Sequence, residues 1–396
     1  MIQISPETQL FIREHSSDDV RTLALQAKKY PDINMPTAIT QIAGRQVAAE
    51  KIPSWREIEE IWYPKHLSLE QCSSEITARY KARLSQGDSL TDLTGGFGID
   101  CSFLATGFKS ATYVERQEEL CEIAAHNFPI LNLNHINVRN EDGVAYLQTM
   151  SPVDCIFLDP ARRNEHGGKT VSIADCEPNV AELEDLLLSK ASRIMIKLSP
   201  MLDLSLALKE LKHTQEVHIL SVNNECKELL ILLGQTSPVE ITIHCVNLFT
   251  KGTQEEQHFV FTREQEQRSQ CTYTDSLGDY LYEPNASLLK AGAFRSIAAA
   301  YPVRKLHPNS HLYTSDTFIE NFPGRIFRIV NQCSFNKKEV KENLADLKKA
   351  NVTVRNFPAT VAELRKRLHL TEGGDTYLFA STLNNGQKVI IRCEKV

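Results

Sequence analysis

Residues 89–100 read SLTDLTGGFGID, and this stretch decides which fold the chain is expected to adopt. A short run of apolar and β-branched residues leads to Asp92, and three glycines follow within the next six positions. Glycine has no Cβ atom, so it lets the backbone turn sharply and approach a ligand closely. The stretch therefore predicts a strand over 89–94, a ligand-binding turn, and a helix over 99–108.

The spacing of these glycines excludes a dinucleotide-binding loop. That fingerprint requires glycine at positions i, i+2 and i+5. Counted from Gly95 the last position holds Asp100, and counted from Gly96 it holds Cys101. Both registers fail, so the loop is not expected to hold a dinucleotide.

A phosphate-binding loop of the G-x4-G-K-[ST] type is the second alternative. Gly168-Lys169-Thr170 imitates the end of that pattern, but Arg163 stands where the first glycine belongs. The segment also follows a polar loop instead of preceding a helix. We therefore reject this alternative as well.

Asp92 instead places a carboxylate beside the glycine loop. A carboxylate repels a phosphate and attracts a cation. S-adenosylmethionine carries a sulfonium and an ammonium group. An acidic strand end followed by glycines therefore favours this cofactor.

Short apolar runs alternate with longer amphipathic runs from residue 66 to residue 234. One helix is predicted between Ser68 and Gly87, ahead of the first strand. Further strands are predicted over 111–116, 136–142, 153–160 and 193–200, with helices between them. This alternation predicts a doubly wound, mainly parallel α/β sheet, and such sheets bind ligands at the carboxyl ends of their strands.

Four segments are predicted along the chain: a helical region (1–65), an α/β core (66–265), a small α+β linker domain (266–320) and a basic α+β domain (321–396). The whole chain has a formal net charge of −6, whereas residues 301–396 alone carry +7. A basic segment attached to an acidic body favours a polyanionic partner such as a nucleic acid.

Acidic residues end the strands that follow the glycine loop: Glu115 in TYVE, Asp142 in VRNEDG, and Asp159 in FLDPARR. With the loop itself, these motifs over roughly 88–234 resemble the class I S-adenosylmethionine-dependent methyltransferases. The resemblance implies that Glu115 accepts the ribose hydroxyls and that Asp142 accepts the adenine amino group. The implied cofactor-binding residues are Asp92, Thr94, Gly95, Gly96, Phe97, Gly98, Glu115 and Asp142.

Asp159-Pro160 matches the motif that faces the transferred methyl group in this family. Methyl transfer is an in-line displacement in which the enzyme mainly aligns the reactants. Asp159 is expected to accept a proton from the acceptor or to orient an exocyclic amine. Pro160 would fix the turn, and Arg162 could stack on a base or hold a phosphate.

The motif around Asp159 departs from two better-known patterns. Enzymes that methylate amino groups of nucleic acids usually show (D/N)-P-P followed by an aromatic residue, but Ala161 and Arg162 stand there in this chain. The carbon-5 uridine enzymes need a cysteine after the next strand, where residues 197–200 read KLSP. Because Cys155 lies inside a predicted strand, we disfavour a covalent thiolate mechanism.

The wider chain is similar to a group of bacterial methyltransferase-like proteins with a THUMP-like domain at the C-terminus. The segments that carry this similarity are YEPNASLLKAGAF at 282–294, GRIFRIV at 324–330 and the basic helices that follow. THUMP domains bind RNA, so the similarity implies an rRNA or tRNA substrate. The C-terminal region is accordingly expected to have a THUMP-like or ferredoxin-like α+β fold.

None of the ten cysteines forms a Cys-x-x-Cys pair, and several fall in apolar runs. This pattern indicates reduced, mostly buried thiols in the cytoplasm, with no metal site. No stretch reaches the ~18 uninterrupted apolar residues that a membrane span needs. The sequence is silent on oligomeric state.

Two other functions stay open at this point. The chain could methylate a small molecule or a protein, or it could be a non-catalytic RNA-binding protein that retains the cofactor fold. The segment 70–74, EQCSS, also has two interpretations: it could face the carboxylate of the cofactor, or it could simply cap a helix.

Overall fold

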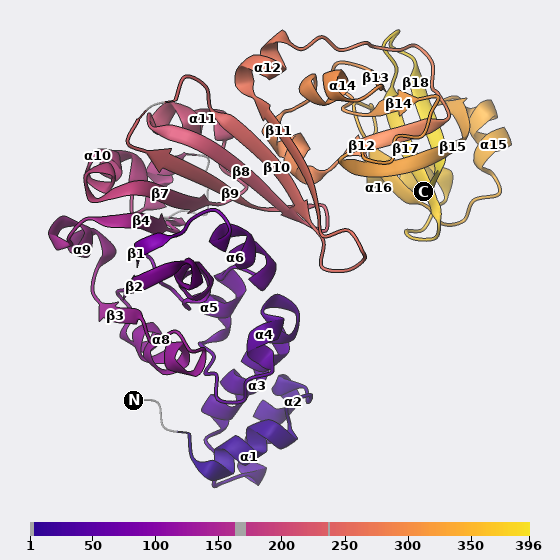
Figure 1. Ribbon diagram of the computed structural model, residues 1–396. Helices are drawn as coiled ribbons and strands as arrows, with labels where there is room; N and C mark the ends of the chain where they lie inside the picture. The colour runs from indigo at the N-terminus through magenta and orange to yellow at the C-terminus, as the bar shows by residue number, and fades with distance from the viewer. Residues whose placement is uncertain (1–3, 163–171, 237) are drawn as a thin grey trace. The chain divides into compact units, whose positions relative to one another are not determined.

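The structure is a computed structural model that describes residues 4–162, 172–236 and 238–396 (Figure 1). The chain divides into two compact units. Unit 1 comprises Met1–Gln215 and Leu230–Pro238, and unit 2 comprises Glu216–Leu229 and Val239–Val396. The finer boundaries near residues 65, 265 and 320 stay predictions.

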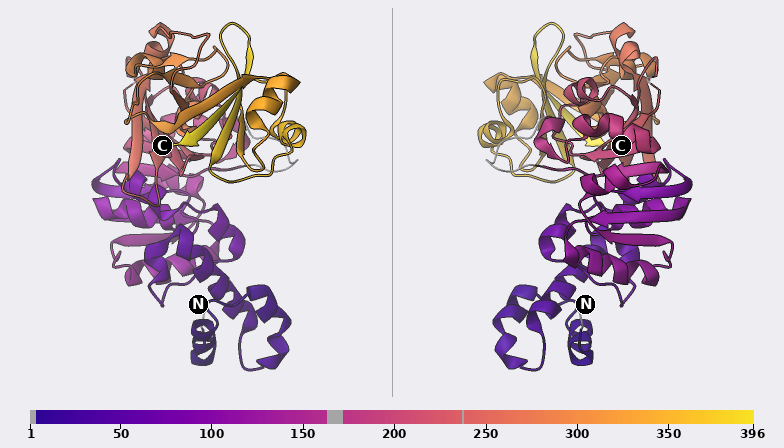
Figure 2. Two further views of the ribbon diagram at one scale, coloured as in Figure 1. Left: turned by 90° about the vertical axis from the view of Figure 1, so that its right-hand side faces the viewer. Right: turned by 90° about the vertical axis from the view of Figure 1, so that its left-hand side faces the viewer.

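Unit 1 begins with a layer of short helices, as the sequence predicted (Figure 2). Its elements are α1 (Pro6–Glu14), α2 (Val20–Leu25), η1 (Ala27–Lys29), α3 (Met35–Lys51) and α4 (Pro53–Arg56). Side chains of Ser5, Asp19 and Asn34 cap the first residues of α1, α2 and α3. Such caps satisfy amide groups that a helix start would otherwise leave unpaired. Phe11 and Ile42 belong to the apolar cluster that packs these helices together.

The single helix predicted between Ser68 and Gly87 is wrong, because the structure contains two. They are α5 (His66–Gln71) and α6 (Glu75–Ala82). The break falls at Ser73, whose hydroxyl bonds to Asp100 instead of continuing a helix. Serine competes with the backbone for hydrogen bonds and so favours such breaks.

The α/β sheet of unit 1 follows the helical layer. Its strands are β1 (Gly87–Asp92), β2 (Phe108–Glu115), β3 (Ile136–Asn140), β4 (Val153–Leu158), β7 (Ala191–Leu198) and β9 (Glu225–Gly234), whose second half lies in this unit. They are ordered β9-β7-β4-β1-β2-β3. The pairs β1–β2, β1–β4, β2–β3 and β4–β7 are all parallel, which confirms the predicted doubly wound α/β sheet.

The helices of this sheet are α7 (Ile99–Leu104), α8 (Glu118–Ile130), α9 (Gly143–Thr149), α10 (Val180–Lys190) and α11 (Leu204–Glu210), with the short turns η2 (Ala105–Gly107) and η3 (Ile173–Asp175). From β1 the chain runs outward to β2 and β3 and then returns to β4 on the other side of β1. This reversal of direction is where an open α/β sheet places its ligand site, beyond the carboxyl ends of the strands.

Unit 2 begins with strands that continue the α/β pattern: β8 (Thr214–Val222), the first half of β9, β10 (Thr242–Leu248) and β11 (Glu256–Thr262), followed by α12 (Arg263–Arg268). Their order is β11-β10-β8-β9. The neighbouring strands β8 and β9 form a hairpin. Its two turn residues, Asn223 and Asn224, have φ of 50° and 67°, which is typical of a tight hairpin turn.

The rest of unit 2 is the predicted α+β region. Its sheet has the order β13-β14-β12-β15-β18-β17-β16. The strands are β12 (Tyr280–Pro284), β13 (Arg304–Lys305), β14 (Tyr313–Ser315), β15 (Gly324–Ser334), β16 (Asn351–Val354), β17 (Thr376–Thr382) and β18 (Lys388–Lys395). The helices are α13 (Ala286–Ala291), α14 (Ser296–Ala300), α15 (Lys337–Leu344) and α16 (Val361–Leu368).

All ten cysteines lie in the described parts of the chain and are free thiols, seven of them buried. Within those parts, no helix combines the length and apolar character needed to cross a membrane.

Candidate cofactor-binding and active site

The glycine loop after β1 is tied to the strands on both sides of it. The amide of Gly95 donates to the carbonyl of Val114 in β2 (2.9 Å), and the amide of Leu93 donates to Phe157 in β4 (3.0 Å). The hydroxyl of Thr94 accepts from the amide of Asp159 at 2.6 Å. The loop is therefore held at the switch point of the sheet, between the ends of β2 and β4.

Two glycines of this loop are required for different reasons. A Cβ atom on Gly95 would lie 2.2 Å from Cε2 of Tyr113, so the site has no room for a side chain. Gly96 has open space around it, but its φ of 53° is a conformation that favours glycine. Gly98, with φ of 86°, precedes α7. The open space at Gly96 lets a ligand approach the backbone of the loop.

Glu115 lies at the end of β2, beside this open position, and is 8% exposed. Its two carboxylate oxygens accept from the amides of Gly96 and Gln117, both at 2.9 Å. Each carboxylate oxygen has a second lone pair. Glu115 can therefore keep these bonds and still accept from a pair of hydroxyl groups.

Asp92 is almost fully buried at the end of β1. One of its oxygens accepts from the amide of Thr94 at 3.0 Å. The other oxygen, Oδ2, has no hydrogen-bond partner among the described residues. Burial raises the pKa of Asp92 well above its usual value, and the nearby carboxyls of Asp100, Asp159 and Glu115 raise it further. A cationic ligand would stabilise the charged form of this buried carboxyl and so lower its pKa again.

Asp142 caps the start of α9, where it accepts from the amides of Val144 and Ala145, each at 3.0 Å. The next residue, Gly143, lies against the glycine loop, because a Cβ atom there would be 2.1 Å from the carbonyl oxygen of Leu93. This close approach brings the exposed side chain of Asp142 to the same end of the sheet as Asp92.

Phe97, predicted to belong to the cofactor-binding loop, has a buried side chain. Its ring is 4% exposed and lies in an apolar cluster with Trp55 and Ile99. The ring centroids of Phe97 and Trp55 are 5.3 Å apart in an edge-on arrangement. The side chain therefore packs the loop against the helical layer, and only its backbone is available to a ligand in the loop.

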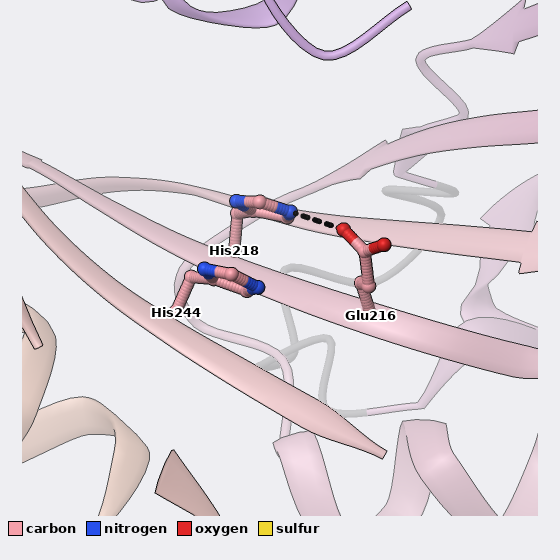
Figure 3. Close-up of side chains that lie close together, drawn as sticks. All are labelled: Glu216, His218 and His244. Carbon is pink, nitrogen blue, oxygen red and sulfur yellow. Dashed lines mark hydrogen bonds and ion pairs between the residues drawn. The ribbon is translucent and has the colours of Figure 1, made fainter. Parts of the chain in front are cut away.

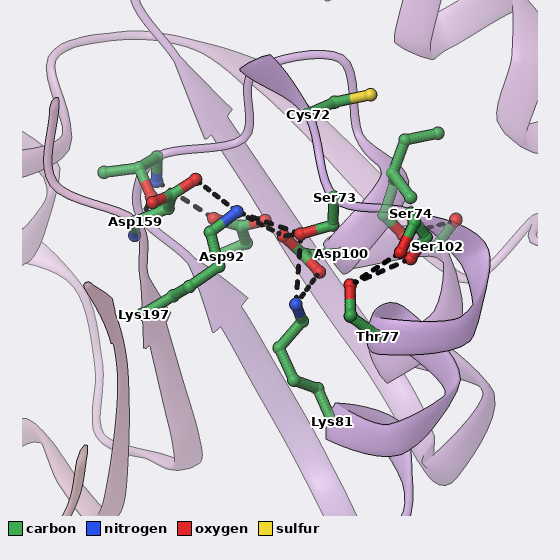
Figure 4. A network of polar contacts seen from close by, with 12 residues as sticks. Cys72, Ser73, Ser74, Thr77, Lys81, Asp92, Asp100, Ser102, Asp159 and Lys197 are labelled. Carbon is green, nitrogen blue, oxygen red and sulfur yellow. Dashed lines mark hydrogen bonds and ion pairs between the residues drawn. The ribbon is translucent and has the colours of Figure 1, made fainter. Parts of the chain in front are cut away.

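A buried ionic network lies next to Asp92 (Figure 4). Asp100 of α7 is within 3.0 Å of the ammonium of Lys81 and within 3.2 Å of that of Lys197. The hydroxyl of Ser73 donates to Asp100 and accepts from both lysines. Since the two ammonium groups face it, the pKa of Asp100 falls below its usual range despite burial.

Lys197 connects this network to Asp159, and their Nζ and Oδ2 atoms are 2.6 Å apart. Desolvation raises the pKa of Asp159, and Lys197 only partly opposes this effect. Asp92 lies close enough to Asp100, Asp159 and Glu115 to be affected by their charge, so this region holds four carboxyl groups and only two ammonium groups, those of Lys81 and Lys197. The excess of acid suits a ligand with positive charge.

Sequence reasoning missed Lys81, Asp100 and Lys197 as functional residues. The available signal was a charged residue inside an apolar run, as Lys197 is in RIMIKLSP. Segment 70–74 had two open interpretations: α6 has no side-chain cap bond, and the hydroxyl of Ser73 lies in the ionic network, while the contact with the cofactor carboxylate stays a prediction.

The residues after Asp159 form a short antiparallel ladder. Pro160 is buried, and β5 (Ala161–Arg162) pairs with β6 (Cys176–Glu177). The side chain of Arg162 is not described, and Arg163 and Gly168-Lys169-Thr170 lie outside the described residues. Cys155 is buried inside β4, where burial raises its pKa to about 11, so it is unsuited to act as a thiolate nucleophile.

Comparisons with known proteins bear on both units. A protein-family model described as a ferredoxin-like domain matches residues 280–323, and one described as THUMP domain-like matches residues 324–395. The crystal structure of a candidate methyltransferase from Porphyromonas gingivalis W83 is 35% identical over 100% of both chains, with a TM-score of 0.87. No curated protein matches the sequence.

Two further structures contain S-adenosylhomocysteine. One, from Streptococcus mutans, is 12% identical over 40% of this chain and 96% of its own, with a TM-score of 0.30. The other, TrmK of M. capricolum, is 13% identical over 41% of this chain and 68% of its own, with a TM-score of 0.32. Similarity at this level supports no conclusion about this chain.

Proposed function

Because this chain belongs to the class I S-adenosylmethionine-dependent methyltransferases that carry a C-terminal THUMP-like domain, we propose that it methylates RNA. In this proposal S-adenosylmethionine is the methyl donor, and Asp159 orients or deprotonates the acceptor. The observation that carries the cofactor part is the buried carboxyl of Asp92, one oxygen of which has no partner among the described residues. The ten free cysteines suit a reducing compartment, and we place the reaction in the cytoplasm.

The residues at the loop fit S-adenosylmethionine. Its sulfonium makes the methyl group electrophilic, and its ammonium group offers donors of the kind that Oδ2 of Asp92 lacks. Glu115 is proposed to accept the ribose hydroxyls, and it lies beside the open backbone of Gly96. The exposed carboxylate of Asp142 is assigned to the adenine amino group.

Asp159 is the acceptor-side residue of this proposal. Its raised pKa makes it a better proton acceptor than an ordinary aspartate, because general bases work best when their pKa approaches the working pH. Lys197 fixes the direction of the carboxylate at 2.6 Å, and Asp100 in turn holds Lys197. Lys197 and Asp100 are therefore positioning residues, and Asp159 is the catalytic residue.

The assignment of RNA depends on the THUMP-like segment. Seven of its lysines are exposed and have no ion-pair partner among the described residues: Lys337, Lys338, Lys341, Lys348, Lys349, Lys366 and Lys395. Two arginines are already engaged, because Arg365 pairs with Glu372 at 3.1 Å and Arg367 lies 4.0 Å over the ring of Phe335. The lysines are the better candidates for phosphate contacts.

Calorimetric titration with S-adenosylmethionine tests the cofactor. Asp92→Ala should weaken binding at least tenfold. Asp88→Ala is the matched control, because Asp88 belongs to the same strand but is exposed and pairs with Lys109 at the surface (2.7 Å). Equal affinity of wild type and Asp92→Ala would remove the cofactor assignment.

Mass spectrometry of nucleosides from a deletion strain tests the substrate. One methylated nucleoside should disappear from rRNA or tRNA, and should return with the wild-type gene but not with Asp159→Ala. A complete set of nucleosides in the deletion strain would contradict the RNA assignment and favour a small-molecule or protein substrate, or a non-catalytic protein.

A further inference from the structure

Four side chains with metal-binding chemistry gather on one face of the first strands of unit 2. Glu216 and His218 are two residues apart on β8 and so point to the same side. His244 of β10 is the register partner of His218. His258 of β11 lies one diagonal step from His244, with their ring nitrogens Nε2 and Nδ1 3.2 Å apart.

Three of these side chains converge closely (Figure 3). Nε2 of His218 lies 3.2 Å from a carboxylate oxygen of Glu216. The rings of His218 and His244 are stacked, with centroids 4.2 Å apart and planes 6° apart, and a nitrogen of each lies on the side of Glu216. One ligand atom from each residue lies within 4.8 Å of the other two, the one such trio among the described residues.

From this geometry we propose that Glu216, His218 and His244 form a binding site for a divalent transition-metal ion, with Zn²⁺ the best-matched ion. Two imidazoles and one carboxylate form a common zinc ligand set, with metal–ligand distances of about 2.0–2.2 Å. Neighbouring ligands around a tetrahedral ion of that size are about 3.3 Å apart, which matches the existing spacing between His218 and Glu216. Small rotations of the His244 ring and of the half-exposed Glu216 side chain close the remaining gap.

His258 supports the site from outside it. Metal-binding histidines usually donate their second ring N–H to a fixed acceptor, which selects the tautomer that binds the ion. His258 is placed to accept from Nδ1 of His244, which leaves the lone pair on Nε2 of His244 for the metal.

The site is independent of the proposed methyl transfer. None of its residues belongs to the cofactor loop or the ionic network, and all of them lie in unit 2. An ion there would join β8 to β10, and β11 through His258. The absence of a Cys-x-x-Cys or compact histidine motif explains why the sequence indicated no metal: the ligands are spread over 29 residues, 216–244, and meet only in the sheet.

Titration of tag-free, metal-stripped full-length protein with Zn²⁺ tests the proposal by calorimetry. We expect one ion per chain, with affinity reduced at least tenfold in His244→Gln and in Glu216→Gln. His213→Gln is the matched control, because His213 pairs with Glu184 at 3.2 Å and belongs to no cluster of three metal-ligating side chains in the described parts of the chain, so this variant should bind as wild type does. Co²⁺ should give visible absorption bands of a low-coordinate ion in wild type only.

Wild-type protein that binds no stoichiometric Zn²⁺ would overturn the proposal, as would a His244→Gln variant that binds like wild type. Circular dichroism of the metal-free variants separates lost binding from lost folding. If His244→Gln, at a partly buried ring, does not fold, the exposed His258→Gln decides: a supporting role predicts a loss of about 10–100-fold in affinity, and unchanged affinity contradicts it.

Discussion

The ammonium of Lys197, near the end of β7, lies 2.6 Å from a carboxylate oxygen of Asp159, which follows β4. The same ammonium is 3.2 Å from Asp100, and Asp100 also holds Lys81. The residue proposed to act on the acceptor is thus joined to a buried chain of alternating charges. Breaking such a chain on one side leaves an uncompensated charge.

We predict that Asp159→Ala abolishes methyl transfer and leaves the affinity for S-adenosylmethionine within about tenfold of wild type. The carboxylate faces the acceptor in our assignment, so its loss removes alignment and proton transfer, an effect of about 10²–10⁴-fold for the proton step alone. Turnover assays and calorimetry check the two parts. Loss of cofactor binding would mean that Asp159 belongs to the cofactor site.

Asp92→Asn should stabilise the free protein at neutral pH while weakening cofactor binding. Burial raises the folded-state pKa of Asp92 above its unfolded value. Asp92 therefore has no effect on the free energy of unfolding below its unfolded pKa of about 3.9, and it lowers that free energy as the pH rises toward its folded pKa. The variant should unfold at higher urea concentration than wild type at pH 8, and at the same concentration near pH 3.

Asp100→Asn should change the stability at pH 8 in the opposite direction to Asp92→Asn. Its folded-state pKa is depressed by Lys197 and Lys81, so its contribution is present above the unfolded pKa and is lost only in acid. This variant should be less stable than wild type at pH 8. If both variants shift stability in the same direction, the assignment of the two carboxyls is wrong.

Gly95→Ala should reduce stability, and Gly96→Ala should chiefly reduce cofactor affinity. The new Cβ at residue 95 would meet the ring of Tyr113, and overpacking of this kind costs about 1–3 kcal/mol. At residue 96 the cost is about 1–2 kcal/mol of backbone strain, and the new methyl group would occupy space proposed for the ligand. Urea unfolding and calorimetry of both variants check this division.

Replacement of Lys337, Lys338, Lys348 and Lys349 by glutamine should flatten the salt dependence of RNA binding. Each lost phosphate contact lowers the slope of log affinity against log salt by about 0.7–0.9. Arg365→Gln is the control, because Arg365 is already paired with Glu372. Filter binding of cellular RNA at several salt concentrations measures the slopes, and a flat response of wild type would exclude phosphate contacts.

The sequence predicted the sheet well because short strand-forming segments such as β4 (VDCIFL) alternate with amphipathic helical segments. It predicted one helix before β1 where the structure has two, because the hydrogen bond of Ser73 to the distant Asp100 outweighs the local helix propensity. Phe97 illustrates another limit. A loop motif identifies a position in the chain, but whether a ring meets a ligand or packs on Trp55 depends on a distant helix.

The ionic network could not be predicted from local patterns. Lys81, Asp100 and Lys197 come from two helices and a strand that are far apart in the chain, and no spacing rule connects them. The same is true of Glu216 and His244, which become neighbours only through the parallel register of β8 and β10.

The hydrogen bond from the amide of Asp159 to the hydroxyl of Thr94 also constrains how such an enzyme can diverge. A mutation that shifts the backbone at Asp159 would also shift the glycine loop, which is proposed to bind the methyl donor. New substrates are therefore more easily acquired by exchanging the THUMP-like module than by remodelling the centre itself.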